Sequence, residues 1–293
     1  MRLATNMTDS GPRCGLVSDG KFYDAGALAE HAGISAAEAL ITTTAVLRAG
    51  AETIAALAAA VASAPTAGTP LAECILGPPV TDPAKIICLG LNYRDHAAEA
   101  NLPEPAAPMI FAKFANSLVG PTDDVVIPRV SKQVDYEVEL GVVIGRTAKD
   151  VPADEALEYV AGVTVVNDVS ARDLQTATSQ WGAGKAIDTF APCGPELVFL
   201  DEIEDIQSLR LQTRVNGKTV QDGNTHEQIF PVAETIAFLT TFMTLEPGDI
   251  IATGTPAGVG MSRTPPLWLK EGDVVETEIE SIGVLRNTFT NGT

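Results

Sequence analysis

The sequence predicts an α+β protein that is mainly β, with a small α/β module ahead of a larger domain. After Pro83, short runs rich in Val and Ile recur and end at Gly, Asp or Pro, which is typical of strands joined by turns. Helical and strand patterns do not alternate as in βαβ units, which disfavours a doubly wound sheet. The 293 residues include 25 Gly and 19 Pro, so many turns are expected.

Residues 1–79 form the predicted N-terminal module. The segment CGLVSDGKFYD predicts a β-hairpin with its turn at Asp19-Gly20. Apolar residues at helical spacing over Leu40–Ala64 predict one helix, which stops before a proline. Closely spaced prolines follow after Gly77 and cannot lie inside a helix. We therefore place the boundary there, with a larger domain over residues 80–293.

The larger domain contains seven runs predicted as strands and two segments predicted as helices. The helices are expected at Asp154–Tyr159 and Pro231–Phe242. The strand-like runs are, in order, KIICLG, DYEVELGVVIG, VAGVTVVND, ELVFL, LRLQTRVNG, DIIATG and DVVETEIESIGVL.

The charge balance argues against a nucleic-acid-binding role. Lys and Arg number 19 against 38 Asp and Glu, and the resulting net charge of −19 repels phosphates and anionic lipid. The four cysteines are far apart and form no CxxC pair, so reduced thiols are expected. The first residues lack the apolar core of a secretory signal, and no apolar stretch suits a membrane span. We expect a cytoplasmic protein with no nucleic-acid or membrane partner.

Acidic residues gather at the start of one predicted strand and at the end of another. In DYEVELGVVIG, the side chains of Asp135, Glu137 and Glu139 would share one face of a continuous strand, where their charges repel. A solvated edge strand is one interpretation. However, the following GVVIG is apolar on both faces, and Asp168 closes a second apolar run. Oxygen ligands without His or Cys favour Mg²⁺, Mn²⁺ or Ca²⁺ over Zn²⁺.

Cationic and amide side chains follow Asp168 in polar, glycine-containing segments. Arg172, Gln175 and Lys185 lie in SARDLQ and WGAGK. Arg binds a carboxylate with two parallel hydrogen bonds and Lys adds a point charge, so near a metal these groups predict an anionic substrate. Ordinary surface ion pairs are the alternative for each residue taken singly.

A histidine and a glutamate form a candidate acid–base pair. His96 and Glu99, in GLNYRDHAAEANLPEPAAP, are three residues apart and would face the same way on a helical turn. A carboxylate beside an imidazole fixes its tautomer and supports a general base. The prolines that follow suit a lid over a site. An incidental histidine on a capped surface turn is the alternative, and His31 and His226 are interpreted as structural or surface residues.

The segment GDIIATGTPAGVG provides a candidate anion-binding loop. Thr255 and several backbone amides flanked by glycine follow an apolar strand, where they suit a carboxylate or an oxyanion. No GK(S/T) follows, and the glycines do not open a helix after a first strand, so a nucleotide-binding loop is excluded.

Six blocks of sequence in this order resemble the fumarylacetoacetate hydrolase family, and the match spans Lys85 to Asn287. The blocks are KIICLGLNYRDHAAE, VDYEVELGVVIG, GVTVVNDVSARDLQ, GKAIDTFAPCGP, NGKTVQDGNT and LEPGDIIATGTPAGVG. The resemblance implies a mixed β-sandwich roll and a homodimer or dimer of dimers. The N-terminal module resembles the extra domain of many bacterial members.

The resemblance also assigns site residues, position by position. It implies metal ligands at Glu137, Glu139 and Asp168, with Mg²⁺, Mn²⁺ or Ca²⁺. It implies a catalytic His and Glu at His96 and Glu99, and a substrate-holding cluster at Lys113, Arg172, Gln175, Lys185 and Thr255. Long eukaryotic members carry a further Asp ligand where this chain has Leu89. In this respect the chain resembles the smaller, three-carboxylate branch of the family.

The function implied is a metal-dependent hydrolase that cleaves a C–C bond in an acylpyruvate or another 1,3-diketo acid. The metal would polarise the oxo-acid carbonyls. His96, oriented by Glu99, would deprotonate water, and Lys185 would stabilise the oxyanion. An isomerase or decarboxylase acting on 2-hydroxy-diene diacids or oxaloacetate would use the same site. A non-catalytic binder of small dicarboxylates is the alternative from another class.

Overall fold

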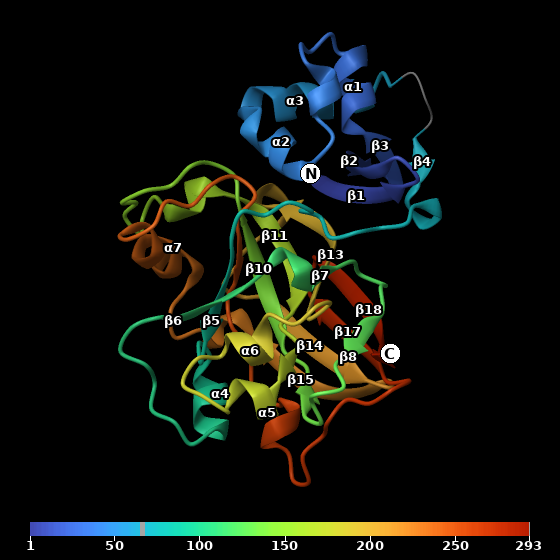
Figure 1. Cartoon of the computed structure of the whole chain (residues 1–293). Helices are drawn as coiled ribbons and strands as arrows, with labels where there is room; N and C mark the ends of the chain where they lie inside the picture. Colours follow the sequence, from blue (N-terminus) through green and yellow to red (C-terminus); the bar gives the residue numbers. More distant parts are fainter. Residues whose placement is uncertain (65–67, 293) are drawn as a thin grey trace.

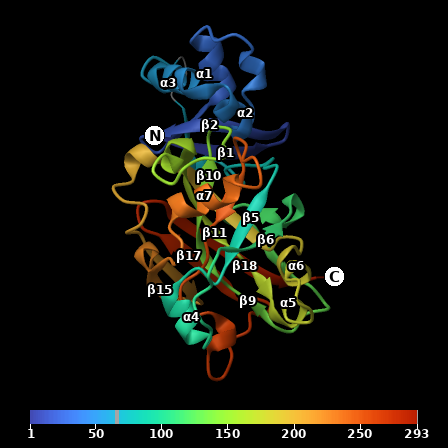
Figure 2. The same cartoon turned by 90° about the vertical axis from the view of Figure 1, so that its left-hand side faces the viewer.

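The protein is built from two packed β-sheets with few helices. The computed structural model describes residues 1–64 and 68–292. In Figure 1 and Figure 2 the N-terminal helices lie at one end of the molecule, and helices α4 (Arg94–Glu99) and α5 (Arg172–Gln175) lie at the other. This arrangement confirms the predicted class, α+β and mainly β, with sheets of mixed strand direction.

The large sheet contains 11 strands in the described part of the chain. In order of pairing they are β4 (Thr69–Pro70), β3 (Lys21–Asp24), β2 (Gly11–Ser18), β1 (Arg2–Thr8), β13 (Ala191–Phe199), β11 (Val160–Asn167), β10 (Val138–Ile144), β16 (Ile250–Ala252), β5 (Ile86–Gly90) and β6 (Met109–Lys113), with β7 (Leu118–Val119) beside β13. Strands β16 and β5 pair in parallel, as do β7 and β13.

A second sheet of five strands packs against the large one. Its order is β15 (Lys218–Asn224), β14 (Arg210–Val215), β17 (Val274–Ile279), β18 (Gly283–Asn291) and β8 (Val125–Ile127), and a short ladder joins β12 (Ser170–Ala171) to β9 (Val134–Asp135). The core between the sheets contains Leu140 and Val163 from the large sheet and Leu211, Ile279 and Leu285 from the smaller one. Burial of these side chains is the main force that holds the sandwich together.

The helices are short, and every helix among residues 1–64 and 68–292 falls short of a membrane-spanning segment. Besides α4 and α5, the α-helices are α1 (Ala25–His31), α2 (Thr43–Arg48), α3 (Gly50–Val61), α6 (Gly182–Lys185) and α7 (Val232–Thr240). The 3₁₀ turns are η1 (Ala37–Ala39), η2 (Leu71–Glu73), η3 (Ala115–Ser117), η4 (Ala156–Tyr159), η5 (Leu200–Glu202), η6 (Thr225–Glu227) and η7 (Gly260–Ser262).

The N-terminal module contains the predicted hairpin but not the predicted long helix. Strands β2 and β3 form the expected hairpin, with Asp19 and Gly20 at φ of 49° and 70°, as a type I′ turn requires. The single helix predicted over Leu40–Ala64 is wrong. Gly50 adopts a φ of +86°, which ends α2 and starts α3 in a new direction.

The N-terminal strands also extend the main sheet. Strand β1 pairs with β13 through Arg2 opposite Val198 and Leu3 opposite Leu197. Hydrogen bonding therefore crosses from residues 1–79 into residues 80–293, and the division into two domains at this point stays a prediction.

Three further predictions from local pattern need correction. The continuous strand through Asp135 and Glu139 is interrupted, because β9 ends at Asp135 to pair with β12 and β10 begins only at Val138. The run DVVETEIESIGVL is a hairpin of β17 and β18, with Ser281 at a φ of 64° in its turn. The segment Asp154–Tyr159 forms only the 3₁₀ turn η4, whereas the helix predicted at Pro231–Phe242 is confirmed as α7.

One close approach in the large sheet yields a stability prediction. A Cβ atom on Gly162 in β11 would overlap the carbonyl oxygen of Val198 in β13. We expect Gly162→Ala to lower the free energy of unfolding by about 1–3 kcal/mol, because the sheet must shift to accept the methyl group. Gly182→Ala is the matched control, since nothing lies within 4 Å of its added Cβ. Equal denaturation midpoints for the two variants would contradict this account of the β11–β13 contact.

Candidate active site

A cavity of about 830 Å³ opens between α4, α5, α6 and the loop after β16. Its polar floor contains Glu137, Glu139, Arg172 and Lys185. The rest of the lining is largely apolar and includes the proline-rich segment after α4 together with Met109, Phe111, Trp181 and Met261.

Three carboxylates meet at the floor of this cavity. One oxygen each of Glu137, Glu139 and Asp168 lies within 4.8 Å of the others, and all three side chains are buried. The register of the sheet explains the convergence. Strands β10 and β11 pair antiparallel with Val138 opposite Asn167, so Glu137 and Asp168 emerge side by side, and the Asp168 amide donates to the Glu137 carbonyl at 2.9 Å.

Glu137 is held by two cations. Its Oε1 accepts from Arg172 Nη2 and its Oε2 from Lys185 Nζ, both at 2.6 Å. Burial alone would raise the pKa of Glu137, but the charges of Arg172 and Lys185 outweigh burial and hold this pKa well below its ordinary value. Glu137 is therefore ionised.

The surroundings of Glu139 shift its pKa in the opposite direction to that of Glu137. Burial raises its pKa well above the ordinary value, and the negative charges of Asp168 and Glu137 raise it further. Its Oε2 accepts from the Gly254 amide at 2.9 Å, which ties the carboxylate to the loop after β16. The raised pKa means that Glu139 lacks a compensating positive charge of its own, in contrast to Glu137.

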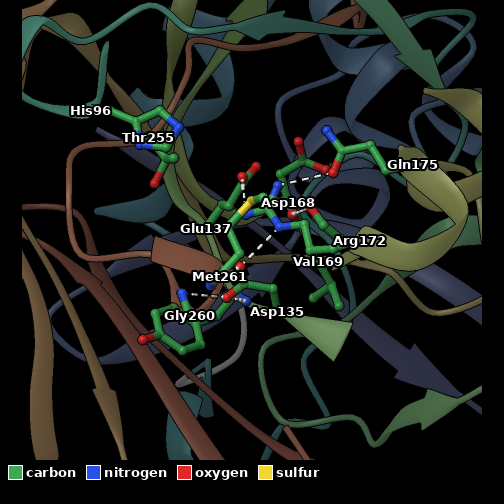
Figure 3. Close-up of polar contacts among 12 residues, drawn as sticks. His96, Asp135, Glu137, Asp168, Val169, Arg172, Gln175, Thr255, Gly260 and Met261 are labelled. Carbon is green, nitrogen blue, oxygen red and sulfur yellow. Dashed lines mark hydrogen bonds and ion pairs between the residues drawn. The ribbon is translucent and has the colours of Figure 1, made fainter. Parts of the chain in front are cut away.

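Arg172 connects Asp135, at the end of β9, to Glu137, which lies just before β10. Its Nε donates to Asp135 at 2.9 Å, its Nη2 to Glu137 at 2.6 Å and its Nη1 to Gln175 at 3.0 Å (Figure 3). Asp135 also accepts from the amides of Gly260 at 2.7 Å and Met261 at 3.0 Å. The guanidinium therefore fixes the floor and one wall of the cavity together.

The two lysines lie at different depths. Lys185 Nζ bridges Glu137 and Asp168 at 2.6 Å each and lines the cavity, with the Phe111 ring centroid 4.9 Å away. Lys113 Nζ lies behind the floor, where it contacts Asp168 at 2.7 Å and donates to the carbonyls of Val169 and Lys185. Its position supports Asp168 rather than the cavity surface.

His96 and Glu99 form the expected pair at the side of the cavity. Nδ1 of His96 lies 3.4 Å from Oε2 of Glu99, and the two side chains are 13% and 23% exposed. Glu99 also accepts from the Gly258 amide at 3.0 Å. Burial raises the pKa of Glu99, but the contacts with His96 and Gly258 outweigh it and lower the pKa below its ordinary value. The Glu99 carboxylate can therefore accept a hydrogen bond from the imidazole and so orient the ring.

The charge balance of the cluster fits a divalent cation. Four buried carboxylates, those of Asp135, Glu137, Glu139 and Asp168, face three buried cations, Lys113, Arg172 and Lys185. One negative charge is left over, which agrees with the raised pKa of Glu139. A divalent ion would compensate this charge and leave the cluster with a net positive charge. The oxygen-only donor set suits Mg²⁺, Mn²⁺ or Ca²⁺.

Comparison with known proteins decides the family. Residues 85–290 match the sequence profile described as "Fumarylacetoacetate (FAA) hydrolase C-terminal". The chain is 50% identical over 220 residues to a human protein named oxaloacetate tautomerase FAHD2A, mitochondrial, a match that covers 74% of this chain and 70% of the human one. This chain belongs to the fumarylacetoacetate hydrolase family.

Solved structures of family members have the same fold. The fumarylacetoacetate hydrolase from Exiguobacterium antarcticum superposes with a TM-score of 0.81 and 33% identity, and all of both chains is covered. The 5-carboxymethyl-2-hydroxymuconate delta-isomerase from Mycobacterium smegmatis superposes with a TM-score of 0.77 and 31% identity, again over both full chains. Members of the family are thus enzymes with different reactions.

The structure brings together most of the residues predicted from the sequence. Those that line the cavity are His96, Glu99, Glu137, Glu139, Arg172, Gln175, Lys185 and Thr255. Asp168 completes the acidic cluster, and Lys113 lies behind it. The solvated-edge interpretation of the acids and the surface-pair interpretation of Arg172 and Lys185 are wrong, because these side chains are buried.

Several residues of the site escaped the sequence analysis. The apolar wall of Phe111, Trp181 and Met261 carries no motif of its own, since its members come from three separate segments. Gly90 packs closely against this wall, because a Cβ at position 90 would overlap the Trp181 ring, but this contact joins distant segments and leaves no local signal in the sequence. Asp135 was expected beside the two glutamates, but its carboxylate turns to Arg172 and the amides of the 260–261 turn.

The acidic cluster yields a metal-binding prediction. We expect Glu139→Gln to weaken Mg²⁺ or Mn²⁺ binding in calorimetry by more than about tenfold, since even outer partners of a metal ligand contribute that much. Glu104→Gln is the matched control, because Glu104 lines the same cavity but is 55% exposed. Wild-type affinity in Glu139→Gln would remove this residue from the ligand set.

Proposed function

We propose that this protein is a divalent-metal-dependent tautomerase that interconverts the keto and enol forms of a small 2-oxo diacid such as oxaloacetate. One observation carries the proposal: a buried, oxygen-only acidic cluster lies in the same cavity as an imidazole oriented by a carboxylate. The 50% identity to the human oxaloacetate tautomerase supports this choice within the family.

Electrostatics favours an anionic, chelating substrate. Glu137, Glu139 and Asp168 would hold Mg²⁺ or Mn²⁺, which when bound supplies Lewis-acid stabilisation of negative charge on the substrate's oxygens. Gln175 lines the cavity, and its side-chain oxygen accepts from Arg172 at 3.0 Å, which leaves its amide group to donate to the substrate, since no hydrogen bond within the described part of the chain uses it. Thr255 offers a hydroxyl on the other side of the cavity.

Proton transfer is assigned to His96. The Glu99 carboxylate accepts from Nδ1, so Nε2 keeps its lone pair and acts as the base. Nε2 removes a proton from C3 of the substrate, the C3–H electrons form the C2–C3 double bond, and the π electrons of the C2 carbonyl move onto its oxygen. The same proton is then given to that oxygen, which completes the enol. The reverse transfer gives the keto form, so atoms and charge balance without water.

The second candidate function is hydrolysis of a C–C bond in an acylpyruvate. The His96–Glu99 pair favours it, because the same Nε2 lone pair can deprotonate a water molecule. Resemblance to a solved fumarylacetoacetate hydrolase also supports this alternative. Lys185 would then stabilise the oxyanion that forms after attack.

The remaining expectations about partners and location stay predictions. A homodimer or dimer of dimers is expected from the family resemblance. The human relative carries the word mitochondrial in its name, so a cytoplasmic location is not assigned to this chain.

A turnover experiment tests the proposal. Loss of the enol absorbance of oxaloacetate is followed with Mg²⁺ and wild-type protein, and His96→Ala is expected to be slower by at least about 100-fold with metal affinity unchanged. His226→Ala serves as the control, because that side chain is 61% exposed on another surface. A His96→Ala variant with the wild-type rate would refute the role of the imidazole.

Product analysis separates the two candidate reactions. With an acylpyruvate, a tautomerase leaves all carbon–carbon bonds intact, whereas a hydrolase releases pyruvate and a second acid. Pyruvate release with no acceleration of oxaloacetate tautomerisation would overturn the first candidate in favour of the second.

A further inference from the structure

Two buried glutamines hold the loop that follows β16, and each donates a hydrogen bond to a threonine hydroxyl. Gln228 Nε2 donates to Thr253 Oγ1 at 2.9 Å. The Thr253 hydroxyl then donates its own hydrogen to the Leu140 carbonyl at 3.0 Å. This first pair is satisfied entirely within the protein and ties the loop to β10.

The second pair is anchored by Gln221, in the block NGKTVQDGNT, a side chain only 1% exposed. Its Oε1 accepts from the Val138 amide at 3.1 Å and from Thr213 Oγ1 at 2.8 Å. Its Nε2 donates to Thr255 Oγ1 and to the Pro256 carbonyl, both at 2.9 Å. An amide N–H can only donate and a carbonyl can only accept, so Val138 and Pro256 fix which end of the Gln221 amide faces the loop.

The orientation of Gln221 determines the direction of the Thr255 hydroxyl. Oγ1 of Thr255 accepts from Gln221, so its hydrogen must be donated elsewhere. Among residues 1–64 and 68–292, no hydrogen bond takes up that hydrogen, in contrast to the one from Thr253 to Leu140. Thr255 lines the cavity, so the donor is left available to a ligand there.

We propose that Gln221 is a positioning residue that makes Thr255 a dedicated hydrogen-bond donor toward a carboxylate or enolate oxygen of the substrate. The inference rests on the proposed function and deepens it, because a donor hydroxyl in this part of the cavity favours substrates that place an anionic oxygen against it. Gln221 itself lines no part of the cavity and acts only through Thr255.

Close packing keeps the Thr255 loop against the strand that bears Gln221. A Cβ on Gly223 in β15 would overlap Pro256, and a Cβ on Gly258 would overlap the Val220 carbonyl oxygen. Arg263 donates to the same Val220 carbonyl and, at 3.1 Å, to Tyr136. The loop therefore has little freedom to turn Thr255 away from the cavity by moving its backbone.

A double-mutant cycle in the metal-loaded protein tests the inference. In Gln221→Glu, assayed at a pH where the new carboxyl group is ionised, the carboxylate only accepts, so the Thr255 hydrogen turns toward it and leaves the cavity. We expect KM for oxaloacetate to rise about tenfold or more, because a hydrogen bond to a charged group contributes about that factor to binding. Mg²⁺ affinity is expected to stay unchanged. Thr255→Val should cause a similar rise, the double variant no more than either, and Thr255→Ser should retain the wild-type KM.

Matched variants separate positioning from simple destabilisation. Gln228→Glu places the same change beside Thr253 and is expected to lower the unfolding temperature while KM stays within about twofold, because Thr253 has no role toward the cavity. If Gln221→Glu does not fold, Gln221→Met takes its place in the cycle, since it removes the donor and keeps the length of the side chain. Additive effects of the Gln221 and Thr255 changes on KM would overturn the inference.

The same variants also distinguish failure of the inference from failure of the proposed function. Oxalate affinity of the Mg²⁺-loaded protein is measured by calorimetry, without turnover. If wild type does not convert oxaloacetate, the proposed function fails, and the cycle in oxalate affinity still tests Gln221. If wild type is active but Thr255→Val binds both oxalate and oxaloacetate as wild type does, the inference fails alone.

Discussion

The site depends on the compensation of carboxylates that are removed from water. Asp135, Glu137, Glu139 and Asp168 are buried where β10 and β11 meet the β9–β12 ladder, and such charges are costly unless each finds a partner. Arg172, Lys185 and Lys113 supply three partners through direct contacts. The one charge left over, reflected in the raised pKa of Glu139, is what makes a divalent cation the natural fourth partner.

This constraint links the fold to the chemistry. The antiparallel register of β10 with β11 places two of the acids together, and the strand break after Asp135 frees that carboxylate to hold Arg172. The loop after β16 supplies the Gly254 amide to Glu139 and the Gly258 amide to Glu99, so one backbone segment orients both the metal-binding and the proton-transfer groups. The same loop presents Thr255 to the cavity.

The sequence predicted the chemistry of the site better than its geometry. The alternation of Glu137 and Glu139 and the position of Asp168 after an apolar run made these acids candidates, because residue type and strand spacing are local properties. The resemblance to the family then singled out the three of them as metal ligands. The turn of Asp135 toward Arg172, the placement of Lys113 behind the floor and the apolar wall around Trp181 depend on contacts between distant segments. The break at Gly50 was missed for a different reason: a run of apolar helix-forming residues outweighs a single glycine in any pattern, although its φ of +86° splits the helix.

The most direct test of the account is crystallographic. Crystals grown with Mn²⁺ are measured at the manganese absorption edge, where the anomalous signal distinguishes the ion from water and from lighter ions. The account predicts one strong peak coordinated by oxygens of Glu137, Glu139 and Asp168, with Lys185 displaced from at least one of its two carboxylates. Full metal occupancy at another position, with these three carboxylates still paired only to Lys113, Arg172 and Lys185, would contradict it.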